Sequence, residues 1–254
     1  MEDNLDMPLS KVLSIMQNRI LTQSTYFGIK ALMSPLDYWV YQEILFAAKP
    51  DVIVEIGNFK GGSTLSLAHM CDLLGSGRVI GIDLCHKAVP DLVKQHPRIT
   101  LLEGDACQRF EEVRGLISKE ERVLVIEDSS HTYENTLRVL HTFSGLLKPG
   151  DYFIVEDGIC QHGLPEGTSP GPYEAVEQFV TENTDFEIDR GKESFLITWN
   201  PKGYLKRIGY TVPESAKNSF KQPPPQTKSS TRDILKLLLP PILVMFIRKL
   251  RKGS

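Results

Sequence analysis

The sequence has few cysteines, and none lies close to another. The four cysteines, Cys71, Cys85, Cys107 and Cys160, form no C-x-x-C pair. This scatter argues against a structural zinc site and against a disulfide framework. It is typical of small buried residues in a reducing compartment, so we expect a cytoplasmic protein.

Strong positive charge and long apolar runs are also lacking. The net charge of -3 gives no reason to expect a nucleic-acid partner. The first residues are acidic and precede no apolar segment, so no secretory signal is expected there. The uncharged run Leu237–Ile247 contains Pro240 and Pro241 and is shorter than the roughly 20 residues that a membrane-spanning helix needs.

The central part of the chain alternates short β-branched runs with helical stretches. This alternation predicts an α/β fold with a mainly parallel, seven-stranded sheet and helices on both faces. An antiparallel hairpin is expected at its edge and a helical extension at the N-terminus. The expected strands are 51–56, 78–83, 99–103, 121–127, 151–156, 185–189 and 194–199. The expected helices are 62–74, 87–95, 107–118, 133–147 and 172–183.

Four regions follow from this pattern. Residues 1–50 read as an N-terminal helical cap, and residues 51–212 as the α/β domain. Residues 213–231 are rich in Pro, Ser and Lys and read as a linker. Residues 232–254 form a basic, apolar tail.

A glycine-rich turn follows the first expected strand and opens a helix. It contains Glu55, Gly57, Gly61, Gly62 and Ser63. The spacing is not G-x-G-x-x-G, which argues against a dinucleotide and a nicotinamide-dependent reductase. Glu55 is suited to a cationic group such as the amino group of an amino acid.

Acids at the next two strand ends extend this pattern. Asp83 ends the second strand, where an acid typically binds both hydroxyls of a ribose. Asp105, within Gly-Asp-Ala after the third strand, could bind an adenine edge. The alternative is an ordinary set of strand–helix turns with capping acids.

Two further apolar strands end in acids. One leads into Asp128-Ser-Ser-His131, and the other into Glu156-Asp157. A buried carboxylate without a partner is costly. Because ligands bind at the carboxyl ends of such strands, we expect Asp128, Glu156 and Asp157 to converge on one hard cation, with His131 nearby.

Six motifs carry a resemblance to a known family. They are residues 34–43, 55–63, 128–131, 155–157, 171–177 and 200–207. In this order they resemble the cephalosporin hydroxylase/rhamnosyl O-methyltransferase family, within the class I S-adenosylmethionine-dependent methyltransferases. The resemblance covers roughly residues 25–210 and implies a Rossmann-like methyltransferase fold.

The resemblance implies an O-methyltransferase that uses S-adenosylmethionine and Mg²⁺. Its acceptor would be a hydroxyl of a sugar, in a glycan or glycolipid, or of a natural product. The implied cofactor-binding residues are Glu55, Gly57, Gly61, Gly62, Ser63, Asp83, Asp105 and Asp128. The implied metal ligands are Asp128, Glu156 and Asp157, and the implied general base is His131.

Two positions depart from the family pattern, and several alternatives stay open. Ser130 stands where many relatives have a second Asp, and Glu127 where an apolar residue is expected. The Ser130 departure supports the alternative of a cofactor-binding scaffold without turnover. His131 could also be an ordinary histidine that is exposed or bonded to an acid. His162, in the Gly- and Pro-containing loop 158–172, is a weaker candidate for contact with the acceptor.

The tail suggests a location and partners. Residues 234–252 combine an apolar run with basic residues and lack acids, which is typical of a segment that lies on an anionic membrane surface. That location would be the inner face of the membrane. Contact with a neighbouring subunit is the other interpretation. The family resemblance also implies a homo-oligomer.

Overall fold

The computed structural model describes residues 5–209. The predicted linker and tail therefore lie outside the described residues. Within the described residues, no helix is both long enough and apolar enough to cross a membrane.

Seven strands form one sheet in the order β5-β4-β3-β6-β7-β9-β8. The five strands from β5 to β7 are parallel, and β9 pairs antiparallel with both β7 and β8. The strands are β3 (Val52–Ile56), β4 (Arg78–Asp83), β5 (Ile99–Glu103), β6 (Val123–Glu127), β7 (Tyr152–Val155), β8 (Phe186–Ile188) and β9 (Tyr204–Arg207). The predicted mainly parallel sheet with an antiparallel edge is confirmed.

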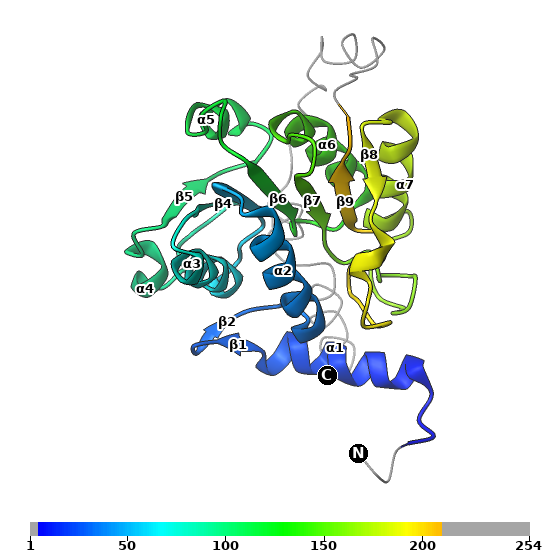
Figure 1. Ribbon diagram of the computed structural model, residues 1–254. Coiled ribbons are helices and arrows are strands. Elements are labelled where there is room, and N and C mark those ends of the chain that lie inside the picture. Colours follow the sequence, from blue (N-terminus) through cyan, green and yellow to red (C-terminus); the bar gives the residue numbers. More distant parts are fainter. Residues whose placement is uncertain (1–4, 210–254) are drawn as a thin grey trace, which may run out of the picture.

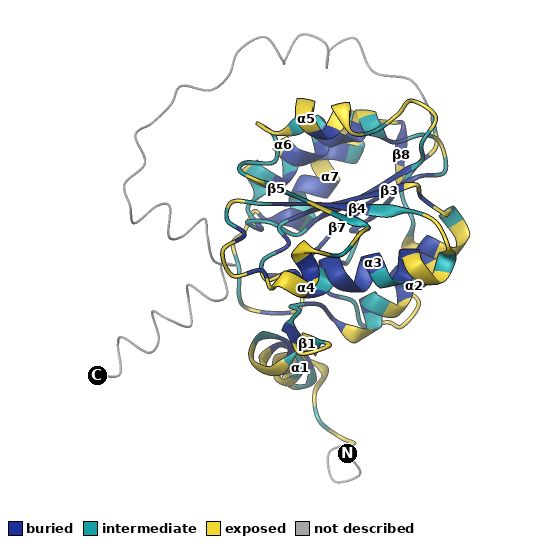
Figure 2. Ribbon diagram, turned by 90° about the vertical axis from the view of Figure 1, so that its left-hand side faces the viewer, coloured by how far each residue is buried: buried dark blue, intermediate teal, exposed yellow. Residues whose placement is uncertain are grey.

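Helices cover both faces of this sheet, as Figure 2 shows. One layer contains α5 (Phe110–Gly115), α6 (Tyr133–Phe143) and α7 (Pro172–Glu182). The other contains α2 (Pro35–Ala48), α3 (Gly62–Leu74) and α4 (Asp91–Lys94). All five helices predicted for the α/β domain are thus present, although α4, α5 and α6 are shorter than expected.

The two helical layers bury separate apolar clusters. Alternate residues of β6 explain this division, because successive side chains of a strand point to opposite faces. Val123 and Val125 pack with α6 and α7, whereas Leu124 and Ile126 pack with α2 and α3. Every residue of β6 is consequently buried.

The N-terminal region contains more than helices. Helix α1 (Leu9–Gln23) lies along one side of the molecule, and a small hairpin, β1 (Thr25–Tyr26) and β2 (Ile29–Lys30), connects it to α2 (Figure 1). The hairpin was not predicted. Ser34 caps α2 by accepting a hydrogen bond from the backbone N–H of Asp37, and Pro35 occupies the first turn, where its missing N–H has no cost.

The predicted strand at 194–199 is wrong. Phe195 and Leu196 are exposed, and the segment carries no regular pairing. Within residues 5–209, the last strand is β9, in which Tyr204 and Leu205 are fully buried between β7 and β8. The prediction at 194–199 rested on an apolar run that lacks alternation. The observed strand, β9, instead contains the charged residues Lys206 and Arg207.

Candidate active site

The turn after β3 brings two strand ends into contact. Gly57 has a φ of 91°, in the left-handed region that glycine tolerates. A Cβ at Gly57 would lie 2.1 Å from the carbonyl oxygen of Asp128. The N–H of Asp128 donates to the carbonyl of Ile56 at 2.8 Å, so the ends of β3 and β6 are held together at this point.

A cavity of about 170 Å³ opens at the carboxyl ends of β3, β4, β5 and β6; we call it the strand-end cavity. Four predicted site residues line it: Gly57, Asp83, Asp105 and Asp128. Its other lining residues are Ile56, Phe59, Ile82, Leu84, Gly104, Ala106, Ser129, Ser130, Asn135, Arg138 and Val139.

Asp83 and Asp105, two of the acids that line this cavity, are each held by a hydrogen-bond donor. One oxygen of Asp83 accepts the backbone N–H of Phe59 at 2.8 Å, which ties β4 to the glycine-rich turn. Asp105 forms an ion pair with Arg138 at 2.8 Å. Arg138, from α6, was not predicted, because nothing in its local sequence separates it from an ordinary helix-surface arginine.

Of the predicted glycine-turn residues, Glu55, Gly61, Gly62 and Ser63 lie outside the strand-end cavity. Glu55 is buried, and the hydroxyl of Thr64 donates to it from the first turn of α3. Burial raises the pKa of Glu55 to about 7. Gly61 and Gly62 allow close packing, since added Cβ atoms would meet Val93 and the carbonyl of Lys30. Ser63 lines a second cavity.

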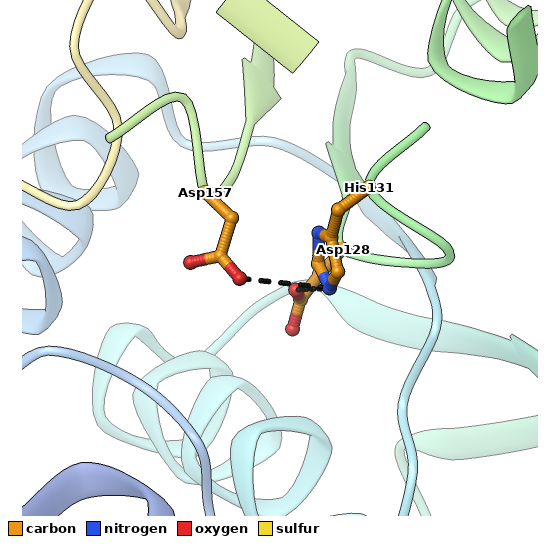
Figure 3. A group of neighbouring side chains, drawn as sticks. All are labelled: Asp128, His131 and Asp157. Atoms are coloured by element: carbon orange, nitrogen blue, oxygen red, sulfur yellow. Dashed lines mark ion pairs between the residues drawn. The ribbon is translucent and has the colours of Figure 1, made fainter. Parts of the chain in front are cut away.

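Asp128, His131 and Asp157 converge where β6 and β7 end (Figure 3). The oxygen or nitrogen atoms with which these three side chains could bind a metal lie within 4.8 Å of one another. The Nε2 atom of His131 is 3.6 Å from Asp128 Oδ1 and 3.5 Å from Asp157 Oδ2. His131 and Asp157 have φ values of 52° and 58°, a conformation that few residues other than glycine adopt and that often marks functional sites.

The third predicted ligand, Glu156, makes a different contact. Its Oε1 atom accepts the hydroxyl of Tyr41 at 2.7 Å, and it is not a member of the Asp128–His131–Asp157 group. Its charge nevertheless acts on that group. Burial, and then the charges of Glu156 and Asp157, raise the pKa of Asp128 well above its ordinary value.

The three acids have no strong basic partner. Burial raises the pKa of Glu156 and of Asp157 as well, and the Asp157 charge adds to the effect on Glu156. Among residues 5–209, none of these carboxylates forms an ion pair with a lysine or arginine, and His131 is the only cationic candidate beside them. Such an arrangement attracts a cation.

Neither of the two departures from the family pattern belongs to the Asp128–His131–Asp157 group, although the charge of Glu127 adds to the raised pKa of Asp128. Ser130 lines the strand-end cavity, as Asp128 does, and its hydroxyl contacts that of Thr132 at 3.3 Å. Glu127 is buried and accepts hydrogen bonds from Ser129 at 2.6 Å and from Asn135. Burial raises the pKa of Glu127 to about 8.

A smaller cavity of about 40 Å³ lies beyond Asp128; we call it the helix-side cavity, since α1 forms one wall. His131, Asp157 and Ser63 line it, and it shares Gly57, Phe59 and Asp128 with the strand-end cavity. Its remaining lining residues are Gln17, Ile20, Leu21, Lys30, Ala31, Leu32, Asn58 and Trp199. The two cavities therefore meet at Asp128.

The walls of the helix-side cavity were predicted only in part. Ser63, His131 and Asp157 were among the residues predicted from the sequence, but Gln17 and Trp199 were not identified. The indole N–H of Trp199 donates to the side chain of Gln17 at 2.6 Å, a contact between residues far apart in the sequence. His162 lines neither cavity, because it stacks on Tyr173 and contacts Glu174 at 2.7 Å.

Comparison with known proteins points to one family. Residues 18–208 match the family described as Rhamnosyl O-methyltransferase/CmcI. Rhamnosyl O-methyltransferase from Mycobacterium tuberculosis H37Rv is 32% identical over 197 residues, covering 75% of this chain and 80% of that protein. The enzyme of the same name from Mycobacterium leprae is also 32% identical, covering 75% of this chain and 86% of that protein.

Solved structures agree with the fold. The apo-structure of CmcI is 25% identical, has a TM-score of 0.57, and covers 74% of this chain and 77% of its own. A form of CmcI described as Mg-SAM has a TM-score of 0.59 at 24% identity, covering 73% and 77%. These likenesses support a Rossmann-like methyltransferase fold.

Proposed function

The chain belongs to the Rhamnosyl O-methyltransferase/CmcI family, and we propose that it transfers the methyl group of S-adenosylmethionine to a sugar hydroxyl with the help of Mg²⁺. One observation carries the proposal. A cavity lined by Asp83 and Asp105 meets, at Asp128, a second cavity lined by His131 and Asp157. The donor side and the acid–histidine side of a transfer reaction are thus adjacent.

The strand-end cavity suits the nucleoside of the cofactor. Asp83 would bind the ribose hydroxyls through the oxygen positions that Phe59 leaves available, and Asp105 would lie beside the adenine. The methionine part would extend past Gly57 toward Ser63, with Glu55, Gly61 and Gly62 shaping that end. Asp128, which lines both cavities, would face the transferable methyl group.

The acid group suits a divalent cation. Asp128, Glu156 and Asp157 offer oxygen ligands, which Mg²⁺ prefers, and none of them forms an ion pair with a lysine or arginine among residues 5–209. The residues present therefore fit Mg²⁺. A bound divalent cation would lower the pKa of a neighbouring hydroxyl and orient it.

His131 is the proposed base. It is buried, its Nε2 atom faces Asp128 and Asp157, and it lines the helix-side cavity. Nε2 would accept the proton of the acceptor hydroxyl while the oxygen attacks the methyl carbon. The electrons of the broken carbon–sulfur bond stay on sulfur, whose positive charge disappears. Proximity and alignment should therefore supply much of the rate.

The acceptor would approach through the helix-side cavity. The relatives are named for rhamnosyl groups, so we propose a sugar hydroxyl within a glycan, glycolipid or natural product. The helix-side cavity has a volume of only about 40 Å³, which admits the reacting edge of a sugar rather than a whole glycan.

A direct assay tests this function. Radiolabelled S-adenosylmethionine would be incubated with 4-nitrophenyl rhamnoside and related glycosides, with Mg²⁺ or with a chelator. We expect label in the glycoside only when Mg²⁺ is present. Cofactor binding in calorimetry without transfer to any glycoside would favour the scaffold alternative, whereas binding of NAD instead would contradict the proposal.

We also propose that the four regions of the sequence keep the roles expected of them, with residues 51–212 as the methyltransferase domain. Residues 234–252 would contact an anionic membrane surface, at the inner face of the membrane, and the protein would form a homo-oligomer. Co-sedimentation with phosphatidylglycerol vesicles tests the membrane contact. Replacing Arg248, Lys249, Arg251 and Lys252 with Gln should weaken it, by about 1 kcal/mol per residue. Unchanged sedimentation would remove the membrane proposal.

A further inference from the structure

A buried polar network adjoins the acids Glu156 and Asp157, and its residues Tyr41, Tyr204 and Asn200 line neither cavity. It joins α2 to the turn that precedes β9. Tyr41 and Tyr204, at its centre, are 1% and 0% exposed and pack edge to face. Each hydroxyl donates to a carboxylate: Tyr41 to Glu156 at 2.7 Å, and Tyr204 to Asp37 at 2.8 Å. The network therefore has two arms. The Tyr41 arm contacts Glu156, one of the three acids of the proposed cation site, whereas the Tyr204 arm contacts Asp37, which is not one of them.

Asn200 connects the first arm to the neighbouring acid. Its Nδ2 atom donates to the hydroxyl of Tyr41 at 3.2 Å, and its Oδ1 atom accepts the backbone N–H of Asp157 at 3.3 Å. Asn200 itself is 1% exposed. A continuous chain of hydrogen bonds thus runs from the backbone of Asp157 through Asn200 and Tyr41 to the side chain of Glu156.

Backbone geometry explains why two successive acids need such support. Successive residues of an extended chain point to opposite sides, so Glu156 and Asp157 would diverge if β7 simply continued. Asp157 instead adopts a φ of 58°, which aspartate reaches only at some cost. The hydrogen bond from its N–H to Asn200 helps to hold this conformation.

The turn that contains Asn200 is packed closely against the end of β7. A Cβ at Gly203 would lie 2.0 Å from the carbonyl oxygen of Val155, and one at Gly158 would lie 2.7 Å from that of Pro201. The N–H of Val155 donates to the carbonyl of Gly203 at 2.8 Å. Asn200 is therefore held firmly against the turn that bears Glu156 and Asp157.

We propose that Tyr41 and Asn200 are positioning residues that orient Glu156 and Asp157 as a pair of ligands for a divalent cation. The inference rests on the proposed function, because it takes these acids as the cation site. Tyr41 fixes one oxygen of Glu156 by its hydrogen bond. Asn200 fixes the turn that directs Asp157 toward His131. Neither residue lines the strand-end cavity or the helix-side cavity.

The test uses Tyr41→Phe with Tyr204→Phe as its matched control. Both substitutions remove one buried hydroxyl that donates to a carboxylate, from rings packed against each other. Only the Tyr41 hydroxyl touches the acid group. The probe is Mn²⁺ alone, titrated into full-length protein and followed by the electron paramagnetic resonance signal of the free ion.

We expect Tyr41→Phe to weaken Mn²⁺ binding by roughly 10–100-fold, the usual effect of losing a partner of a metal ligand, and Tyr204→Phe to change it less than about twofold. Asn200→Ala should behave like Tyr41→Phe. Binding of S-adenosylhomocysteine should stay the same in all three variants. Equal Mn²⁺ affinity in Tyr41→Phe and Tyr204→Phe would overturn the proposal, even if Asn200→Ala did not fold.

The outcome also separates this inference from the proposed function. If the unmodified protein binds Mn²⁺ and the Tyr41 variant does not, but no glycoside is methylated, the positioning role stands and the proposed reaction fails. A protein that binds no Mn²⁺ at all overturns the positioning role together with the cation site.

Discussion

Gly57 and Asp128 touch through their backbones, and this contact holds together the two cavities of the site. The space between the Gly57 Cα and the Asp128 carbonyl cannot hold a methyl group, which would lie 2.1 Å from that oxygen. Both residues line both cavities. If these two residues moved apart, the junction of the two cavities would widen. The proposed methyl donor and acceptor would then be held together less closely.

Gly57→Ala should therefore destabilise the protein and reduce cofactor binding. The new Cβ meets backbone atoms and the φ of 91° is unfavourable for alanine, so we expect a loss of roughly 2–4 kcal/mol in the free energy of unfolding. Gly75→Ala is the matched control, since Gly75 has a φ of 74° but nothing within 4 Å of an added Cβ. Its cost should be about 1 kcal/mol. Urea unfolding of both variants checks this, and equal costs would contradict it.

Asp128→Ala should abolish Mg²⁺-dependent turnover and leave cofactor binding nearly intact. The substitution removes the carboxylate that faces both Glu156 and Asp157. The loss of turnover should exceed the roughly 10–100-fold that removal of a ligand's hydrogen-bond partner causes. Turnover with labelled cofactor and calorimetry with S-adenosylhomocysteine measure the two effects. Glu120→Ala, at an exposed acid, is the control, and full activity of Asp128→Ala would refute the metal role.

His131→Ala should lower kcat by roughly 10²–10⁴-fold, as expected for loss of a general base, with little change in cofactor affinity. His162→Ala is the control, because His162 lines neither cavity. Steady-state turnover of both variants measures the effect, and an unchanged kcat in His131→Ala would exclude His131 as the base.

The positions of the acids could be predicted from the sequence because they follow from strand ends. Apolar runs that stop at Asp128 and at Glu156 identify two neighbouring strands of a parallel sheet, and β6 and β7 are indeed adjacent. The direction of each side chain could not be predicted in the same way. The contact of Glu156 with Tyr41 depends on a helix 115 residues away along the chain.

The other site residues that the sequence did not identify contact partners from distant segments. Arg138 reaches Asp105 across 33 residues, and Trp199 reaches Gln17 across 182. Neither pair has a local pattern that reveals it. The same reason explains the misplaced last strand, since β9 is defined by its insertion between β7 and β8 rather than by its own apolar content. Glu127 was left open and proves to be buried against Ser129 and Asn135.

Two roles of Glu55 can be distinguished by experiment: binding of the cofactor's amino group, and support of the first turn of α3. Burial raises the pKa of Glu55 to about 7, with Ser63, Thr64 and the nearby charge of Asp83 as its other influences. If the ionised carboxylate binds the amino group of the cofactor, the affinity for S-adenosylhomocysteine should rise by roughly tenfold between about pH 5.5 and 7, as the carboxylate loses its proton.

Glu55→Gln should abolish this rise, because the amide cannot ionise. The control ligand is 5′-methylthioadenosine, which lacks the amino-acid part of the cofactor and should bind both proteins equally across this pH range. If S-adenosylhomocysteine gives the same pH dependence in the variant as in the unmodified protein, Glu55 acts only as an anchor for the first turn of α3, through the hydroxyl of Thr64. Calorimetric titrations at several pH values would distinguish the two roles.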